Sequence, residues 1–176
     1  MTATPLIETG RLRLRAHRRD DFAALHALWR DPAVYTHITG RPSTSEESWA
    51  RLLRYAGHWQ LMGFGYWAIE DKASGAFIGE AGLADYRRDI EPPFGATPEM
   101  GWLIDPEFHL RGLASEALRA IIGWGRVNIA APQYACMIAP DNAASVALAA
   151  SLGFRETGRT SYHGQPTILM RLSLAD

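Results

Sequence analysis

The sequence predicts an α/β (α+β) fold in a single domain that spans residues 1–176, and three observations support this prediction. The chain of 176 residues is long enough for one domain with a sizeable core, and 47% of its residues are hydrophobic. Apolar residues recur with a period of two in some segments and at helical spacing in others. The second half reads strand, helix, strand, helix, strand, which implies a right-handed crossover onto a partly parallel sheet. We therefore expect a mixed central sheet of about six to seven strands flanked by about four helices.

The first half predicts one strand, two helices and a hairpin. Alternating arginine and apolar residues make residues 11–16 a half-buried strand. Residues 20–31 begin with two acids, carry apolar side chains at helical spacing and end in Asp-Pro, which predicts a helix. A loop over 35–42 leads to a second helix over 45–60, whose start contains two overlapping capping boxes. Two strands over 65–70 and 76–83 enclose a turn, which is typical of a β-hairpin.

The second half begins with a loop over residues 86–98, which contains three prolines and could either fold over a site or lie in solvent. The remaining strands and helices follow in a regular order: a strand from Glu99, a helix opening near Gly112, a strand over 134–138, a helix from Asp141-Asn142 to Leu152-Gly153, and strands over 154–160 and 167–174.

Charge and composition exclude several classes of function. The formal net charge of −1 provides no basis for nonspecific binding to nucleic acid. No apolar run approaches the roughly 18 residues of a transmembrane helix, so we expect no membrane partner. The first eight residues lack the features of a signal peptide, and the single cysteine, Cys136, is expected in the core, so we expect a cytoplasmic location. The six histidines show no paired spacing on a helix face, so we predict no metal site.

A candidate anion site lies where the helix near Gly112 begins. The first turn of a helix has about four unpaired N–H groups and a partial positive charge, and this combination binds phosphate. Gly112 allows a sharp turn and a close approach by a ligand, while Arg111 adds a cation. The segment contains neither a P-loop nor a dinucleotide-binding glycine motif. A glycine is also common in ordinary helix starts, so the pattern alone leaves both interpretations open.

Two motifs together resemble the GNAT superfamily of acyl-CoA N-acyltransferases, over nearly the whole chain. His109–Ala114 matches the family pattern Gln/Arg-x-x-Gly-x-Gly/Ala, except that histidine replaces the first residue. Further along, Asn142–Ser145 and Leu152–Phe154 match the family's Asn-x-x-Ser helix that ends in Leu-Gly-Phe. Residues 6–15 and 78–79 are similar to the branch of ribosomal-protein N-terminal (RimJ/RimL-like) acetyltransferases, which also contains many enzymes of unknown acceptor.

The resemblance implies an acetyl-CoA-dependent N-acetyltransferase, which moves an acetyl group to a primary amine by direct attack in a ternary complex. The acceptor would be a protein N-terminus or a small-molecule amine, and the enzyme would be a monomer or homodimer. A strand backbone would lie along the pantetheine arm of acetyl-CoA, and the helix start would hold the pyrophosphate. The residues implied in binding acetyl-CoA are Trp102, Leu103, Ile104, His109, Leu110, Arg111, Gly112, Leu113, Ala114, Ser115, Asn142 and Ser145. Candidate walls of the acceptor site are Trp29, Tyr35 and Tyr162.

The groups that transfer protons follow less directly from the resemblance. Glu99 opens the strand beside the site and could accept the amine proton, with Glu80 on the neighbouring strand as its rival. Either could instead be a solvated carboxylate at a strand end. The family often has a tyrosine four residues before the glycine of Leu-Gly-Phe, to protonate the thiolate, and here that position is Ala149. Ser145 or a water molecule would then have to serve.

Two other functions are compatible with the same motifs. One is a non-catalytic protein that senses acyl-CoA on the same scaffold, which the alanine at position 149 favours slightly and the retained carboxylates disfavour. The other is a nucleotide-binding switch protein, which ATP or GTP would stabilise in place of coenzyme A. The sequence does not identify the acceptor.

Overall fold

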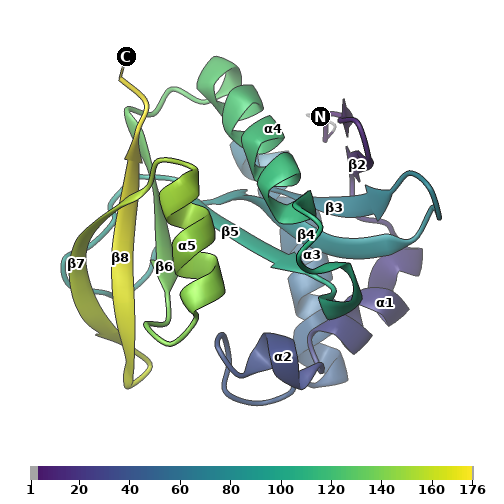
Figure 1. The fold of residues 1–176 in the computed structure, drawn as a ribbon, viewed down its shortest axis with the longest axis horizontal. Helices are drawn as coiled ribbons and strands as arrows, with labels where there is room; N and C mark the ends of the chain where they lie inside the picture. Colours follow the sequence, from purple (N-terminus) through teal and green to yellow (C-terminus); the bar gives the residue numbers. More distant parts are fainter. Residues whose placement is uncertain (1–3, 176) are drawn as a thin grey trace.

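The computed structural model describes residues 4–175, which form one eight-stranded mixed sheet with five α-helices (Figure 1). The strands follow the order β1-β2-β3-β4-β5-β6-β8-β7 across the sheet. The strands are β1 (Ile7–Glu8), β2 (Leu12–Arg15), β3 (Tyr66–Asp71), β4 (Phe77–Ala84), β5 (Glu99–Ile104), β6 (Gln133–Ile138), β7 (Arg155–Tyr162) and β8 (Gln165–Ser173). The helices are α1 (Phe22–Leu28), α2 (Pro32–Tyr35), α3 (Ser45–Met62), α4 (Leu113–Asn128) and α5 (Ala143–Ser151).

The predicted fold class is confirmed. The structure has one strand and one helix more than the sequence predicts, and both escape prediction for the same reason. β1 has two residues and α2 has four, so neither is long enough to show a period of apolar residues. Only the pairing of β1 with β2, with Ile7 opposite Leu14, defines the extra strand. α2 begins with Pro32 directly after its capping residue Asp31, where the sequence predicts a helix end and a loop.

Helices cover both faces of the sheet. α1 and α3 lie on one face, and α4 and α5 lie on the other (Figure 1). The larger core cluster joins the sheet to α4, through side chains such as Leu118 and Ile121, whereas Leu25 and Leu52 anchor α1 and α3 in a second cluster. None of the helices described within residues 4–175 is long and apolar enough to cross a lipid bilayer.

Two helix starts are capped as the sequence predicts. Of the two overlapping capping boxes before α3, the structure uses the second: Thr44 Oγ1 accepts the N–H of Glu47 at 3.2 Å, and Glu47 Oε2 accepts the N–H of Thr44 at 2.8 Å. At the start of α5, Asn142 Oδ1 accepts the N–H of Ser145 at 3.1 Å. These caps fix where the two helices begin and so place the segments before them.

The sheet is interrupted between β5 and β6, its one parallel pair. The two strands are joined at a single register position, Glu99 opposite Ala135, where Ala135 N–H donates to Pro98 O at 3.0 Å. Beyond this position the strands diverge, so that β5 leads to α4 while β6 leads to α5 (Figure 1). The helix starts with the two predicted motifs therefore lie beyond the open end of the sheet.

Candidate active site

The loop before α4 contains two left-handed residues, Leu110 with φ 60° and Gly112 with φ 74°. This conformation is unusual for leucine, and the side chain of Leu110 is fully exposed. Gly112 is the N-cap of α4, and no side chain caps this helix. Within residues 4–175, the N–H groups from Leu110 to Ser115 have no protein acceptor. Unpaired N–H groups at the start of a 16-residue helix are an arrangement that favours anions, and they lie where the sequence predicts an anion site.

The charged side chains near this loop are held by other partners. Glu116, in the first turn of α4, accepts hydrogen bonds from Thr9 Oγ1 at 2.5 Å and from Arg11 Nε at 2.7 Å. Burial alone would raise the pKa of Glu116, but these hydrogen bonds together hold it below its usual range. Arg11 also donates to Arg111 O at 2.8 Å. Arg11 therefore neutralises the acid closest to the unpaired N–H groups and leaves the N–H groups themselves free.

His109 occupies the position where the GNAT pattern has glutamine or arginine. Its Nε2 lies 2.8 Å from Ile104 O, at the end of β5. The imidazole therefore ties the loop back to the strand, and the backbone N–H of His109 donates to Pro106 O at 3.1 Å. The sequence groups His109 with the anion-binding residues, whereas the contacts within the described chain give it a role in positioning the loop.

The edge of β5 that faces β6 carries free backbone groups. Asp105 N–H donates to Ile78 O at 2.8 Å, so odd-numbered residues of β5 pair with β4 in this antiparallel ladder. The backbone groups of Met100, Trp102 and Ile104 therefore point away from β4. Past the single β5–β6 register position, Trp102 has no strand partner on this side within residues 4–175. A linear chain with amide groups could pair with this edge as an added strand.

The start of α5 carries two of the predicted residues, Asn142 and Ser145. The side-chain oxygen of Asn142 caps the helix, and the Oγ of Ser145 has no hydrogen-bond partner among the described residues. Ser145 is half-buried, and Ala149, one turn further along α5, is fully buried in the larger core cluster. The helix therefore presents one hydroxyl at its first turn and no phenol at position 149.

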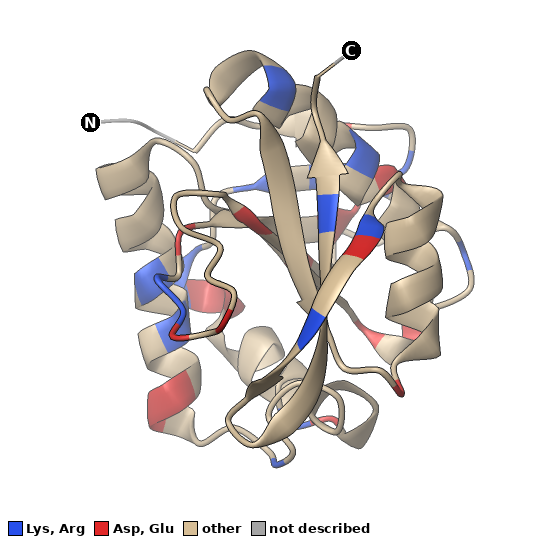
Figure 2. Ribbon diagram, turned by 90° about the vertical axis from the view of Figure 1, so that its left-hand side faces the viewer, with Lys and Arg blue, Asp and Glu red and all other residues tan. Residues whose placement is uncertain are grey.

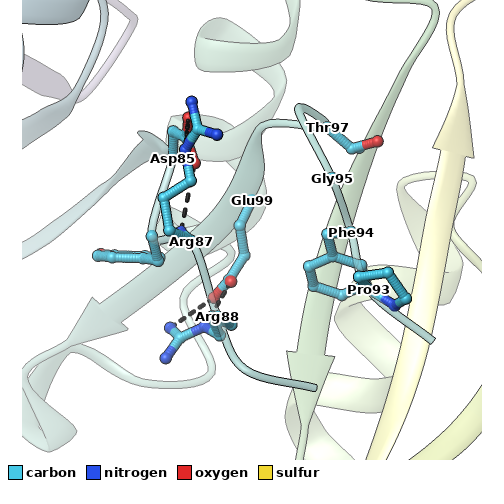
Figure 3. A pocket seen from close by; sticks show the side chains of 9 residues that line it. Asp85, Arg87, Arg88, Pro93, Phe94, Gly95, Thr97 and Glu99 are labelled. Atoms are coloured by element: carbon cyan, nitrogen blue, oxygen red, sulfur yellow. Dashed lines mark hydrogen bonds and ion pairs between the residues drawn. The ribbon is translucent and has the colours of Figure 1, made fainter. Parts of the chain in front are cut away.

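Glu99 is held by an arginine from the loop between β4 and β5 (Figure 3). Arg88 donates from Nε to Glu99 Oε2 at 2.5 Å and from Nη2 to Glu99 Oε1 at 2.7 Å, and its Nη1 donates to Tyr162 OH at 2.8 Å. This bidentate pair borders a cavity of about 190 Å³, whose walls also include Tyr86 and Phe94. The predicted base therefore lies beside a cavity, paired with a cation and 6% exposed.

Glu80, the rival base, lies on the same face of the sheet but in the interior. Its Oε1 accepts hydrogen bonds from Trp29 Nε1 at 2.9 Å and from Tyr55 OH at 2.6 Å. Its Oε2 lies 3.5 Å from His17 Nε2, and the residue is 1% exposed. Glu80 is opposite Leu103 and Glu99 is opposite Ala84, so the two carboxylates are offset by four positions along the β4–β5 ladder. Glu99 has the easier access to an incoming amine.

The three residues predicted as acceptor walls lie in different surroundings. Trp29 is buried at 7% exposure beside Glu80, and Tyr162 on β7 reaches Arg88 and so the Glu99 cavity. Tyr35 is a half-buried residue on α2. Trp29 and Tyr162 therefore belong to the surroundings of two different carboxylates.

Sequence reasoning does not identify several residues of this region. Arg88 and Tyr86 lie in the irregular loop that separates β4 from β5, where no periodic pattern exists. Tyr66 OH lies 2.0 Å from where a Cβ of Gly101 would stand, so the glycine makes room for the phenol. Gly82 and Gly101 are opposite each other in the sheet. Glycines within strands are the feature of the sequence that could have predicted this close approach. Across residues 4–175, no three His, Cys, Asp or Glu side chains group as a metal site.

Comparison with known proteins places the chain in a family. A family model described as the acetyltransferase (GNAT) domain matches residues 11–155. The uncharacterised protein YkkB of Bacillus subtilis is 28% identical over 160 residues, which are 87% of each chain. A protein of Bordetella pertussis described as a GnaT-family acetyltransferase has a solved structure with a TM-score of 0.86 and 28% identity, covering 97% of this chain and 100% of that chain.

A further solved structure shows the fold at lower identity. RimL, described as the ribosomal L7/L12 α-N-protein acetyltransferase in complex with coenzyme A, is 19% identical, with a TM-score of 0.78 over 96% of this chain and 98% of that chain. The family model covers most of the chain, including β5, the loop before α4 and the start of α5. The chain therefore belongs to the GNAT family of acetyltransferases.

Proposed function

We propose that the protein is an acetyl-CoA-dependent N-acetyltransferase that acts on a primary amine in a ternary complex. The observation that carries this proposal is the row of unpaired N–H groups from Leu110 to Ser115, together with the unpaired edge of β5 at Trp102. A diphosphate and an extended amide-containing arm are the two chemical features that coenzyme A presents. RimL, which has the same fold, has been solved with coenzyme A, and this supports the assignment.

Separate parts of the chain fit the diphosphate and the amide-containing arm of coenzyme A. The backbone of the loop and first turn of α4 would bind the pyrophosphate, because N–H groups and the helix dipole both favour an anion there. The backbone of Trp102 would pair with the pantetheine arm, and one N–H of this edge would polarise the thioester carbonyl. Asn142 and Ser145 would bind the arm from the side of α5. The neighbouring residues Leu103 and Ile104 hold the edge in place through their packing in the two core clusters.

The transfer itself needs one bond to form and one to break. The amine nitrogen forms a bond to the thioester carbonyl carbon, and the bond from that carbon to sulfur breaks. Glu99 accepts the proton that the amine nitrogen loses and passes it to solvent, and the departing thiolate takes a proton from Ser145 Oγ, which is free of other hydrogen bonds and takes a proton back from water. A positioned acid or base of this kind contributes about 10²- to 10⁴-fold in rate.

The experiment that tests this function measures thiol release from acetyl-CoA in the presence of peptides and small amines, with mass spectrometry of the products. Cys136 is buried, and burial raises the pKa of its thiol, so the protein contributes little background to a thiol-specific reagent. Acetylation of at least one amine, lost in Glu99→Gln, is the expected result. Thermal stabilisation by acetyl-CoA without transfer to any amine would instead identify a sensor, and stabilisation by ATP or GTP alone would identify a nucleotide switch.

A further inference from the structure

Three arginines lie on the α3 side of the sheet, around the carboxylates described above. The guanidinium carbon of Arg51, on α3, lies 3.5 Å from the ring centroid of Trp29. The guanidinium carbon of Arg54 lies 5.4 Å from the ring centroid of Tyr86, and that of Arg88 lies 4.5 Å from the same centroid. Figure 2 shows the basic positions of α3 beside the loop that follows β4. α3 and the loop after β4 therefore bring Arg54 and Arg88 to the same aromatic ring, that of Tyr86.

Two of these arginines have no anionic partner. Among residues 4–175, neither Arg51 nor Arg54 forms an ion pair. The Nη1 of Arg51 is buried and has no hydrogen-bond partner in the described chain. Buried donors without a partner are uncommon in folded proteins, where water or a ligand usually satisfies them.

The two strand acids on this face, Glu80 and Glu99, are already bound, and Asp85 in the adjoining loop pairs with Arg87 at 2.9 Å. Glu80 accepts from Trp29 and Tyr55, and Glu99 accepts from Arg88. Arg51 and Arg54 are thus left without an anionic partner among the described residues, and a bound anion could supply one.

We infer that the amine acceptor carries a carboxylate close to its amine, and that Arg54 and Arg88 bind this carboxylate. This inference rests on the proposed function, since it describes the acceptor of that reaction. Arg88 already demonstrates the required geometry: it holds the carboxylate of Glu99 through two N–H···O bonds, which is the arrangement that guanidinium groups favour. The adjacent cavity of about 190 Å³ offers space for a small charged group.

The same arrangement explains how Glu99 becomes available as a base. While Arg88 holds both of its oxygens, the Glu99 carboxylate is engaged by a cation and is not directed at an incoming amine. A carboxylate on the acceptor replaces Glu99 on Arg88, and the released Glu99 faces the amine of the acceptor and takes the proton that the nitrogen loses when it attacks. An amine without a carboxylate leaves Glu99 on Arg88 and reacts slowly.

The test uses pairs of acceptors that differ in one charge. Peptide amides with Asp or Asn at the second position, and with Glu or Gln there, are compared by kcat/KM with acetyl-CoA in excess. We expect the acidic member of each pair to react about 10- to 100-fold faster, which is the range for a hydrogen bond to a charged group. Arg54→Gln should remove this preference by slowing only the acidic member. The matched control is Arg126→Gln, which removes an exposed arginine from α4, on the opposite face.

The outcomes separate this inference from the proposed function. Equal rates for the two members of every pair, or a preference that survives Arg54→Gln, would overturn the inference and leave the acetyltransferase intact. If no amine is acetylated, the proposed function fails, and calorimetric titration of the coenzyme A-saturated protein with the same peptides decides the inference. Tighter binding of the acidic peptide that Arg54→Gln weakens and Arg126→Gln does not would still support the carboxylate site, and equal binding would reject it.

Discussion

His17 Nε2 lies 3.5 Å from Glu80 Oε2, and neither atom has a hydrogen-bond partner within the described chain. The other oxygen of Glu80 is the shared acceptor of Trp29 Nε1 and Tyr55 OH. Glu80 therefore connects β4 to α1 and α3 by polar contacts that run through the apolar interior. This position explains why a carboxylate on the acceptor face can be structural although its neighbour Glu99 is proposed to be catalytic.

The contribution of Glu80 to stability can be measured with two variants. Glu80→Ala leaves two buried donors without an acceptor, and we expect the free energy of unfolding in urea to fall by about 2–4 kcal/mol. Glu80→Gln retains an oxygen acceptor, so it should lose only about 1 kcal/mol. If both variants lose the same free energy, the hydrogen bonds to Trp29 and Tyr55 are not the source of the stabilisation.

The role of Gly112 can be separated from its backbone strain by comparison with Gly75. Gly112 has φ 74° and Gly75, in the turn between β3 and β4, has φ 71°, so alanine is strained to a similar degree at both positions. We expect each Gly→Ala variant to lower the free energy of unfolding by about 1 kcal/mol. Only Gly112→Ala should weaken coenzyme A, by about 10-fold in Kd, because its methyl group would stand beside the unpaired N–H groups. Isothermal titration calorimetry measures both Kd values. If the two variants bind coenzyme A equally tightly, the diphosphate does not bind at this loop.

Much of the α4 start could be predicted because its signals are local. A helix start, its glycine and its unpaired N–H groups depend on residues within a few positions of each other, and the sequence places them at His109–Ala114. The caps of α3 and α5 were predictable for the same reason. The end of the β5–β6 ladder after Glu99 was not, because it depends on the paths of two strands that are far apart in the chain.

The surroundings of Glu80 and Glu99 could be predicted from the sequence only in part. The partner of Glu99 is Arg88, which an irregular loop brings back to the strand, and no period in the sequence predicts that path. Glu80 had a signal, because it is the one charged residue in the strand Phe77–Ala84, which is buried on both faces. That signal predicts burial, but the contacts with Trp29 and Tyr55 require the packing of α1 and α3 against the sheet.

A buried network around Arg15 predicts how stability depends on pH. Arg15 donates to both oxygens of Asp21 at 2.8 Å and to Glu70 Oε2 at 2.7 Å. The hydrogen bond from Arg15 is the main cause of the lowered pKa of Glu70. Burial alone would raise the pKa of Asp21, but Arg15 and the N–H of Arg18 together hold it below its usual range. Both carboxyl groups are therefore more acidic in the folded state than in the unfolded chain.

The sign of the pH effect follows from these shifts. Groups with a lowered folded pKa stabilise the protein fully above their unfolded pKa, near pH 4, and lose that contribution as the pH falls through the folded pKa. We expect the free energy of unfolding to decrease steadily below about pH 5. Arg15→Met should lose about 3–5 kcal/mol at pH 7 and approach the wild type as the pH falls, because protonation removes the buried charge of Asp21, whereas Glu70 keeps its pair with Arg13. Arg159→Met, which affects the exposed pair with Glu156, is the control and should change stability by less than about 1 kcal/mol.

The source of the proton for the departing thiolate is tested at Ser145. Ser145 is in the first turn of α5, its Oγ has no other partner in the described chain, and alanine keeps the helix intact. We expect Ser145→Ala to lower kcat by about 10²-fold or more with little change in the melting temperature. Unchanged kcat would assign the protonation to water.

Ala149 offers the complementary change, because it occupies the position of the family's tyrosine. Its side chain is 0% exposed and packed in the larger core cluster, so a phenol placed there has no free space to enter. We expect Ala149→Tyr to lower the free energy of unfolding by about 1–3 kcal/mol or more through overpacking, and to leave the reduced kcat of Ser145→Ala unrestored in the double variant. Restoration of kcat in that double variant, at wild-type stability, would mean that α5 can shift to expose position 149. A tyrosine at position 149 could then replace the hydroxyl of Ser145 as the proton donor, and the fold could accommodate its side chain.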